Sequence, residues 1–247
     1  MTDQDLSVQL YTVRNALAED FDGTLERIAG YGFRQVEPFG FTKYLDGLRK
    51  LGQHGLSAPT THMGLVADAD LDAIFAAAVE LGIGTVIEPA IREPHWQTAE
   101  DIKSTADQLN AAAEKAADHG LRVGYHNHWW ELESRIDGKH GLEVLADHLA
   151  PEVGLEVDTY WANAGGADVP ALLGRLGDRV FALHIKDGDG TLDTKKQVAV
   201  GAGVLPVWDF IDAKPDALRV VELDDSSGDL LTAVRDSRAY LSAGKGA

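Results

Sequence analysis

Two kinds of segment alternate along the chain, and their hydrophobic patterns differ. Short runs rich in branched apolar and aromatic residues predict β-strands. There are eight of these runs, at positions 6–11, 34–39, 57–63, 84–89, 121–127, 153–158, 180–185 and 218–223. Between them apolar residues recur every three or four positions beside Glu and Lys, as at 71–81 and 99–117. That period predicts amphipathic helices.

Residues with known end preferences mark where the predicted helices begin and stop. Gly82 and Gly120 stand between a helical run and the next strand run, where a helix often needs a left-handed residue. Asp70 and Thr98 stand just before two helical runs, and both are residue types that cap helix N-termini.

The lengths of these units predict the fold. Eight units in 247 residues leave about 31 residues for each, the length of a strand with its return helix. We therefore expect a single α/β domain over residues 1–247, a (β/α)8 TIM barrel. An open doubly wound sheet is the alternative, but residues 12–15 after the first strand contain none of the glycines typical of it. The longest irregular stretch, 186–205, predicts a lid or binding loop, with an unstructured insertion as the alternative.

Charge and composition narrow the function. The chain carries 22 Lys and Arg against 40 Asp and Glu, a formal net charge of −18, and it has no cysteine. The missing cysteines exclude disulfides and thiolate catalysis, so a tight metal site must use His, Asp and Glu. The negative charge argues against nucleic acid as a partner. No segment is long and apolar enough to span a membrane and the acidic start does not predict a signal peptide, so we expect a cytoplasmic protein.

Ionisable residues stand at the ends of seven of the eight predicted strands. They are Glu37, His62, Glu88, His126, Asp158, His184 and Glu222. In a TIM barrel the carboxyl ends of the strands form the active-site face. One polar residue at a strand end is common, but the repetition indicates a functional site.

Three of these residues end consecutive strands and can converge on one point: Asp158, His184 and Glu222. A carboxylate or imidazole buried there needs a partner or a metal. With a fourth ligand from the fifth strand they predict one divalent ion, Mn²⁺, Mg²⁺, Co²⁺ or Zn²⁺. Glu156 lies two positions before Asp158 and faces the same side, so one can ligate while the other supports it.

Several segments in this order resemble the sugar phosphate isomerase/epimerase family, which has a xylose-isomerase-like barrel. They are residues 8–14, 32–37, 125–131, 155–162, 183–187, 201–203 and 221–224. The resemblance implies a divalent metal held at the ends of strands five to eight, by Asp158, His184, Glu222 and a residue of the fifth strand. The epimerases usually have a glutamate at the fifth-strand position, whereas this chain has His126, with Glu131 five residues later. We expect His126 to be the fourth ligand, with Glu131 as the alternative.

The resemblance also implies a reaction, in which the protein removes the proton next to the carbonyl of a sugar or keto-sugar through a metal-stabilised enediolate. We expect an isomerase or epimerase in which Glu222 is both ligand and acid/base, and Glu131 or His128 is the opposing group. Four further residues are predicted to bind the substrate: His62, Lys186, Glu37 and Trp161. With few cations near the predicted site, we expect a neutral, unphosphorylated sugar.

Other functions remain open at this point. A lyase or dehydratase of the inosose-dehydratase or 3-keto-glycoside lyase kind is the main alternative, because a histidine at the fifth strand can protonate a leaving group. A nuclease on a similar barrel would need basic DNA-binding loops, which the charge opposes, and a non-catalytic sugar-binding barrel is a third possibility. We expect a small carbohydrate as the partner, with no nucleic acid or membrane, and the sequence leaves a homo-oligomer open.

Overall fold

The computed structural model of the protein describes residues 6–67 and 69–246. The first five residues, on which the expectation of no signal peptide depends, lie outside this described part. Within it, no helix is long and apolar enough to cross a membrane.

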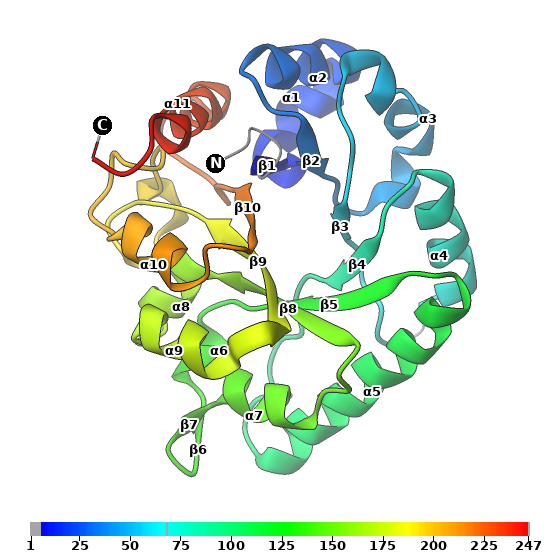
Figure 1. Ribbon diagram of the computed structural model, residues 1–247, viewed down its shortest axis with the longest axis vertical. Helices are drawn as coiled ribbons and strands as arrows, with labels where there is room; N and C mark the ends of the chain where they lie inside the picture. Colours follow the sequence, from blue (N-terminus) through cyan, green and yellow to red (C-terminus); the bar gives the residue numbers. More distant parts are fainter. Residues whose placement is uncertain (1–5, 68, 247) are drawn as a thin grey trace.

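Eight parallel strands form a nearly closed barrel, seen down its axis in Figure 1. The strands are β1 (Leu6–Gln9), β2 (Gln35–Glu37), β3 (Thr60–His62), β4 (Thr85–Glu88), β5 (Arg122–His126), β8 (Val153–Asp158), β9 (Val180–Ile185) and β10 (Leu218–Val221). They pair in the order β2-β1-β10-β9-β8-β5-β4-β3. Between β2 and β3 the barrel is closed by isolated parallel bridges, Gln35 to Ser57 and Phe39 to His62. The predicted (β/α)8 barrel is confirmed, and each strand lies inside its predicted run.

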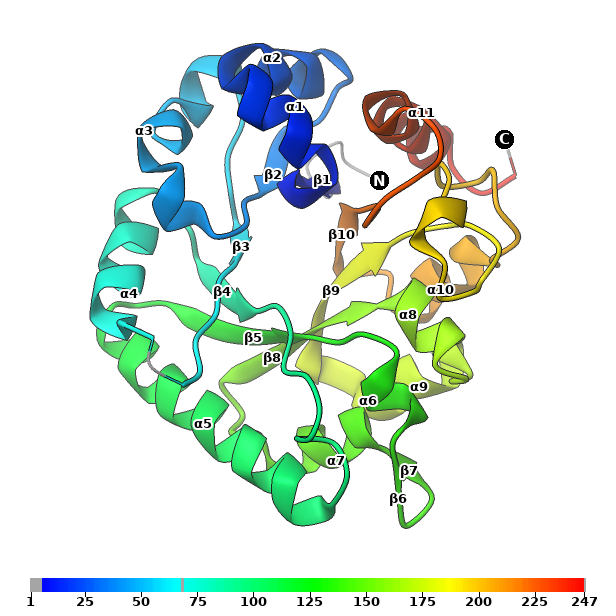
Figure 2. The same ribbon diagram turned by 180° about the vertical axis from the view of Figure 1, so that it is seen from behind.

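Helices cover the outside of the barrel, as both views show (Figures 1 and 2). The longer ones are α2 (Phe21–Gly30), α4 (Leu71–Glu80), α5 (Ala99–Asp118), α7 (Gly141–His148), α9 (Val169–Leu176), α10 (Val207–Ala213) and α11 (Leu230–Ala243). Short helical turns lie in the loops: α1 (Arg14–Glu19), α3 (Leu45–Leu48), α6 (Trp130–Glu133) and α8 (Thr159–Ala164), with 3-10 turns at Leu10–Val13, Phe41–Lys43, Leu51–His54, Gly177–Arg179 and Thr194–Lys196. The predicted helix starts are confirmed, because Asp70 accepts a hydrogen bond from the Ala73 amide and Thr98 forms a capping box with Asp101.

A small hairpin was not predicted. It consists of β6 (Arg135–Ile136) and β7 (Lys139–His140), joined by Asp137 and Gly138. Both turn residues have positive φ, 49° and 85°, as the tight two-residue turn between antiparallel strands requires. The Asp-Gly pair was a signal for this turn in the sequence.

The long irregular stretch after β9 is organised around one buried carboxylate. Asp187 accepts hydrogen bonds from the amides of Gly188, Gly201, Gly203 and Leu205. A Cβ at Gly203 would lie 2.1 Å from Asp187 Oδ1, so only glycine fits there. The stretch is therefore a compact loop held at both ends, and the alternative of an unstructured insertion is wrong.

Candidate active site

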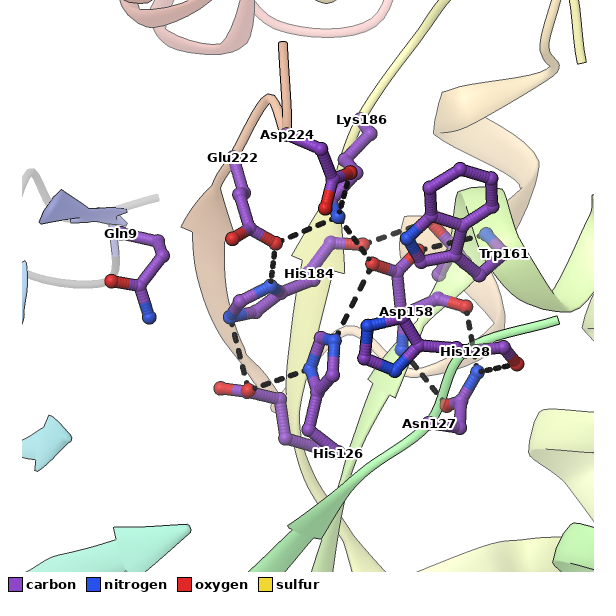
Figure 3. A network of polar contacts seen from close by, with 12 residues as sticks. Gln9, His126, Asn127, His128, Asp158, Trp161, His184, Lys186, Glu222 and Asp224 are labelled. Carbon is purple, nitrogen blue, oxygen red and sulfur yellow. Dashed lines mark hydrogen bonds and ion pairs between the residues drawn. The ribbon is translucent and has the colours of Figure 1, made fainter. Parts of the chain in front are cut away.

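The four residues predicted to bind the metal meet at the carboxyl ends of their strands (Figure 3). His126 ends β5, Asp158 ends β8, His184 lies near the end of β9, and Glu222 follows β10. One donor atom from each lies within 4.8 Å of the donor atoms of the other three, and all four side chains are buried. The strand register explains this, because Asp158 is paired with His184 across the β8–β9 ladder.

The contacts inside this group are close. His184 Nδ1 lies 2.7 Å from Glu222 Oε2, and His126 Nε2 lies 3.7 Å from Asp158 Oδ2. Burial raises the pKa of Asp158 to about 6, although Lys186 opposes this. Burial lowers the pKa of His126 to about 3, with His184 adding to the effect, so this ring is neutral and keeps a free lone pair.

Lys186 places its ammonium among three carboxylates. Its Nζ lies 2.9 Å from Asp158, 2.7 Å from Glu222 and 2.6 Å from Asp224. Burial alone would lower the pKa of Lys186, but these carboxylates hold it well above its usual value. In turn, and against its own burial, Lys186 and His184 hold the pKa of Glu222 well below the usual range. We call Lys186, Asp158, Glu222 and Asp224 the ion cluster. The Lys186 ammonium, predicted to bind the substrate, is engaged inside this cluster.

A second layer of polar side chains lies beneath the predicted ligands. Glu156 Oε2 contacts His62 Nε2 at 2.6 Å, His126 Nδ1 at 3.0 Å and His184 Nε2 at 3.0 Å. Glu37 Oε1 contacts His184 Nε2 at 2.8 Å and also accepts a hydrogen bond from the side-chain amide of Gln9. Glu37, predicted to bind substrate, therefore lies in this lower layer.

The residues of the site fit a divalent cation. The site contains one ammonium, that of Lys186, and five buried or half-buried carboxylates, so negative charge is in excess before the imidazoles are counted: Glu37, Glu156, Asp158, Glu222 and Asp224. Asp158 Oδ2 is buried and has no hydrogen-bond partner besides its ion-pair contact. Two imidazole nitrogens and two carboxylates are a donor set that Mn²⁺, Co²⁺ or Zn²⁺ accepts. His126, Asp158, His184 and Glu222 would hold the cation.

A cavity of about 370 Å³ opens above this group. Its lining includes His62, His126, His128, Glu222 and Asp224 on the polar side. The remaining lining residues are Tyr11, Phe39, Gly40, Met63, Gly64, Pro89, Ala90 and Arg92. A polar floor with apolar walls suits a small, partly hydrophilic ligand. The stretch 186–205, predicted as a lid or binding loop, contributes no residue to this lining.

Glu131 and His128, predicted as the opposing acid/base, occupy different positions. Glu131 is fully buried, where its carboxylate accepts hydrogen bonds from the Tyr125 hydroxyl at 2.6 Å and the His128 amide at 2.8 Å. Burial raises the pKa of Glu131 to about 8. His128 lines the cavity with its ring stacked on Trp130, 4.3 Å between centroids. The structure therefore brings His126 to the metal group and places Glu131 beneath His128.

Trp161, predicted to stack on a sugar ring, is 1% exposed and is absent from the cavity lining. It packs against Trp129 at 4.9 Å, and Lys186 Nζ lies 5.4 Å from the centre of its ring. The aromatic rings that do line the cavity are Tyr11 and Phe39. Sequence reasoning missed both, although each is the last residue of a predicted strand run.

The sequence of the chain matches a known family. Residues 24–214 match the family described as the xylose isomerase-like TIM barrel. The chain belongs to this family, which confirms the resemblance found in the sequence.

Curated relatives cover part of the chain. An inosose dehydratase from Geobacillus kaustophilus (strain HTA426) is 26% identical over 181 residues, 68% of this chain and 58% of that protein. A protein named urease accessory protein UreD, from Mycolicibacterium gilvum (strain PYR-GCK), is 31% identical over 168 residues, 64% of this chain and 57% of that protein. The chain thus spans less than three fifths of the length of either relative, and their names differ.

Solved structures share the whole fold. A sugar phosphate isomerase/epimerase from Parabacteroides distasonis ATCC 8503 has a TM-score of 0.82 and 22% identity, covering 99% of this chain and 96% of that chain. The IolI protein with a bound zinc atom has a TM-score of 0.75 and 17% identity, covering 97% of each chain. At these identities the likeness establishes the fold alone.

Proposed function

We propose that the protein is a metal-dependent isomerase or epimerase that removes the proton next to the carbonyl of a sugar or keto-sugar. The observation that carries this proposal is the convergence of His126, Asp158, His184 and Glu222 within 4.8 Å of one another, with His126 and Glu222 also lining a cavity. A divalent cation held by these four residues would polarise the carbonyl and stabilise the negative charge that develops when the proton leaves.

The side chains of the site have separate roles in this proposal. Glu222 lines the cavity and is ionised, so it is available to take the proton from the substrate carbon. His128 lines the same cavity as a neutral imidazole, and we assign to it the exchange of the second proton with the substrate. Glu131 holds His128 in place through the backbone amide, so we assign it a positioning role in place of the direct role expected from the sequence.

Lys186 contributes fixed positive charge. Its ammonium contacts Glu222 and Asp158 directly, and this keeps both carboxylates close together without a second cation. His62 lines the cavity and can bind a substrate hydroxyl. Tyr11 and Phe39 contribute the apolar surface against which the carbon skeleton packs.

The substrate we propose is a neutral, unphosphorylated carbohydrate. Arg92 is the one Lys or Arg among the residues that line the cavity, and it is exposed at the rim beside Trp130, 5.2 Å from the ring centre. A phosphate group usually needs several cations or a helix N-terminus. Matched pairs of sugars and sugar phosphates in a thermal-shift screen with Mn²⁺ test this, and preference for the phosphates would contradict it.

A lyase or dehydratase on the same scaffold is the second candidate. The observation that favours it is His128, because burial and the neighbouring His126 lower its pKa well below the usual value. A neutral imidazole in the cavity can take or pass on a proton when a β-substituent leaves. The inosose dehydratase named above is consistent with this candidate.

The test is proton exchange in deuterated water. The protein is incubated with a panel of sugars and keto-sugars and Mn²⁺, and mass spectrometry follows each substrate. An isomerase or epimerase gives a product of unchanged composition that carries deuterium at the reacting carbon, whereas a dehydratase gives a product lighter by one water. The Glu222→Gln variant is expected to lose exchange. Retention of wild-type exchange by this variant, or after chelation, would refute the proposal.

A further inference from the structure

One carboxylate oxygen contacts three imidazole rings beneath the predicted metal ligands. Glu156 Oε2 lies 2.6 Å from His62 Nε2, 3.0 Å from His126 Nδ1 and 3.0 Å from His184 Nε2. Glu156 and His184 are 0% exposed, and the other two rings are also buried. Because these groups are buried, the protons of the three rings must be arranged around this one oxygen.

An ionised carboxylate only accepts hydrogen bonds, so each ring nitrogen that faces Glu156 must carry a hydrogen. For His126 this nitrogen is Nδ1, which leaves the lone pair on Nε2. That atom faces Asp158 Oδ2 at 3.7 Å. For His184 the facing nitrogen is Nε2, and its other nitrogen, Nδ1, faces Glu222 Oε2 at 2.7 Å.

We propose that Glu156 is a positioning residue that fixes His126 as the Nδ1–H tautomer and thereby makes Nε2 the donor atom for a metal ion. This inference rests on the metal site proposed above. When one ring nitrogen of a histidine binds a metal, the other nitrogen donates its N–H to a partner. That partner sets the orientation and basicity of the ring, and its loss typically weakens metal affinity 10- to 100-fold. The same contact turns His184 Nδ1 toward the site.

Glu37 is a natural comparison for Glu156, because it is a buried carboxylate in the same layer. Glu37 Oε1 contacts His184 Nε2 at 2.8 Å and His62 Nε2 at 3.2 Å, so it shares two rings with Glu156. Among the contacts of the described residues, the ion pair of His126 Nδ1 is with Glu156. Of these two carboxylates, Glu156 is therefore the one that can set the tautomer of His126.

A second cation in the lower layer is the competing explanation, since His62, His126, Glu156 and His184 also form a compact donor group. This group shares His126 and His184 with the upper one. Filling both groups would require each shared ring to bind a cation through both nitrogens and to lose its N–H. The distances from Glu156 Oε2, 2.6 to 3.0 Å, are instead those of hydrogen bonds.

The test reads the tautomers directly in the metal-free protein. Protein labelled with ¹⁵N-histidine gives two-bond nitrogen–proton spectra that distinguish the Nδ1–H from the Nε2–H form, and a His126→Gln variant assigns the signal. We expect wild-type His126 to be in the Nδ1–H form alone. Any other pattern for His126 overturns the inference, whether or not the protein binds a metal or turns over a sugar.

Two matched variants sharpen the test. In Glu156→Met the acceptor at Nδ1 is gone and Asp158 remains near Nε2, so His126 should change to the Nε2–H form and Co²⁺ affinity should fall 10- to 100-fold. In Glu37→Met the His126 form should not change.

An unchanged His126 tautomer or an unchanged Co²⁺ affinity in Glu156→Met, or the same tautomer change in Glu37→Met, overturns the inference. If wild-type protein shows the expected tautomer but binds no Co²⁺, the proposed function fails and the tautomer assignment stands. Two bound Co²⁺ ions per wild-type chain would support the competing explanation and overturn ours.

Discussion

The ion cluster and the pocket around Glu131, where Tyr125 and His128 contact its carboxyl group, both bury carboxylates at the mouth of the barrel. The pKa of Glu222 in the ion cluster and the pKa of Glu131 are shifted in opposite directions. In the ion cluster the ammonium of Lys186 lies within 3 Å of three carboxylates, and the pKa of Glu222 is held well below its usual range despite burial. Around Glu131 the hydrogen-bond donors are a phenol and a backbone amide, and burial raises its pKa to about 8. Burial alone therefore does not set the pKa of a carboxylate, because its charged and hydrogen-bonded partners decide the direction of the shift.

The largest expected effect comes from removing the Lys186 ammonium, which is present in the ion cluster and has no counterpart among the hydrogen-bond partners of Glu131. Lys186→Met leaves three carboxylates facing one another, and breaking a buried ion pair in this way costs about 3–5 kcal/mol of unfolding free energy. Urea denaturation in the presence of a chelator measures this loss. Lys103→Met is the control, because Lys103 pairs with Asp107 on the exposed face of α5 and its loss should leave the urea midpoint unchanged. If Lys186→Met were as stable as the wild type, the Lys186 ammonium would not be needed to stabilise the carboxylates of the ion cluster, and the comparison would be wrong.

A divalent cation should act on one region and not on the other. At a concentration one hundred times its dissociation constant, a bound ion stabilises the folded protein by about 2.7 kcal/mol. Wild-type protein and Glu131→Gln should both gain this amount on addition of Mn²⁺, because Glu131 lies outside the donor group. Asp158→Asn should gain much less. Thermal unfolding with and without Mn²⁺ measures the three shifts, and an equal gain in Asp158→Asn would remove Asp158 from the ligand set.

The third effect is the pH dependence that the Glu131 pocket imposes. At pH values between the usual glutamate pKa near 4.5 and the pKa of about 8 in the folded protein, Glu131 keeps a proton that the unfolded chain has lost. Raising the pH through this window therefore lowers the stability of the wild type, and the contribution levels off above pH 8. Glu131→Gln lacks the ionisation, so its stability relative to the wild type should increase from pH 5 to pH 8. Denaturant titrations at the two pH values compare the proteins, and a constant difference would contradict the assignment.

The smallest effect concerns a single hydrogen bond in the same pocket. Tyr125→Phe removes the hydroxyl that donates to Glu131 Oε1 at 2.6 Å, which should cost about 1 kcal/mol. The cost should be larger at pH 9 than at pH 6, because the hydroxyl then donates to an ionised carboxylate. Mn²⁺ affinity, measured by calorimetry, should not change. A weaker Mn²⁺ affinity in this variant would show that the Glu131 pocket and the proposed metal site are energetically coupled, contrary to this comparison.

The sequence predicted the barrel more fully than the site. The strands and the caps at Asp70 and Thr98 depend on local patterns, and these survive in the folded chain. The choice between His126 and Glu131 could not be made from spacing, because it depends on the α6 turn, which directs Glu131 onto Tyr125 and away from the cavity. The place of Trp161 likewise depends on packing between neighbouring loops, which no periodicity records.

The contacts of Lys186 illustrate the same limit. Lys186 was predicted to bind the substrate, but its ammonium contacts the carboxylates of Asp158, Glu222 and Asp224. Asp224, beyond the end of β10, is the carboxylate nearest to its ammonium, and Gln197 from the long loop donates a hydrogen bond to the same Asp224 oxygen. Partners that come from two loops far apart in the sequence are fixed only by the folded chain.

Asp187 gives the barrel a place where new sequence can be tolerated. Because this side chain binds the amides at both ends of the loop, the entropy of closing the loop depends little on what lies between. Leu192 and Asp193 are exposed at positions remote from those amides. We expect peptide insertions or fluorescent labels at this point to leave the strands and the cavity undisturbed, whereas a side chain at Gly203 would release the loop from its anchor.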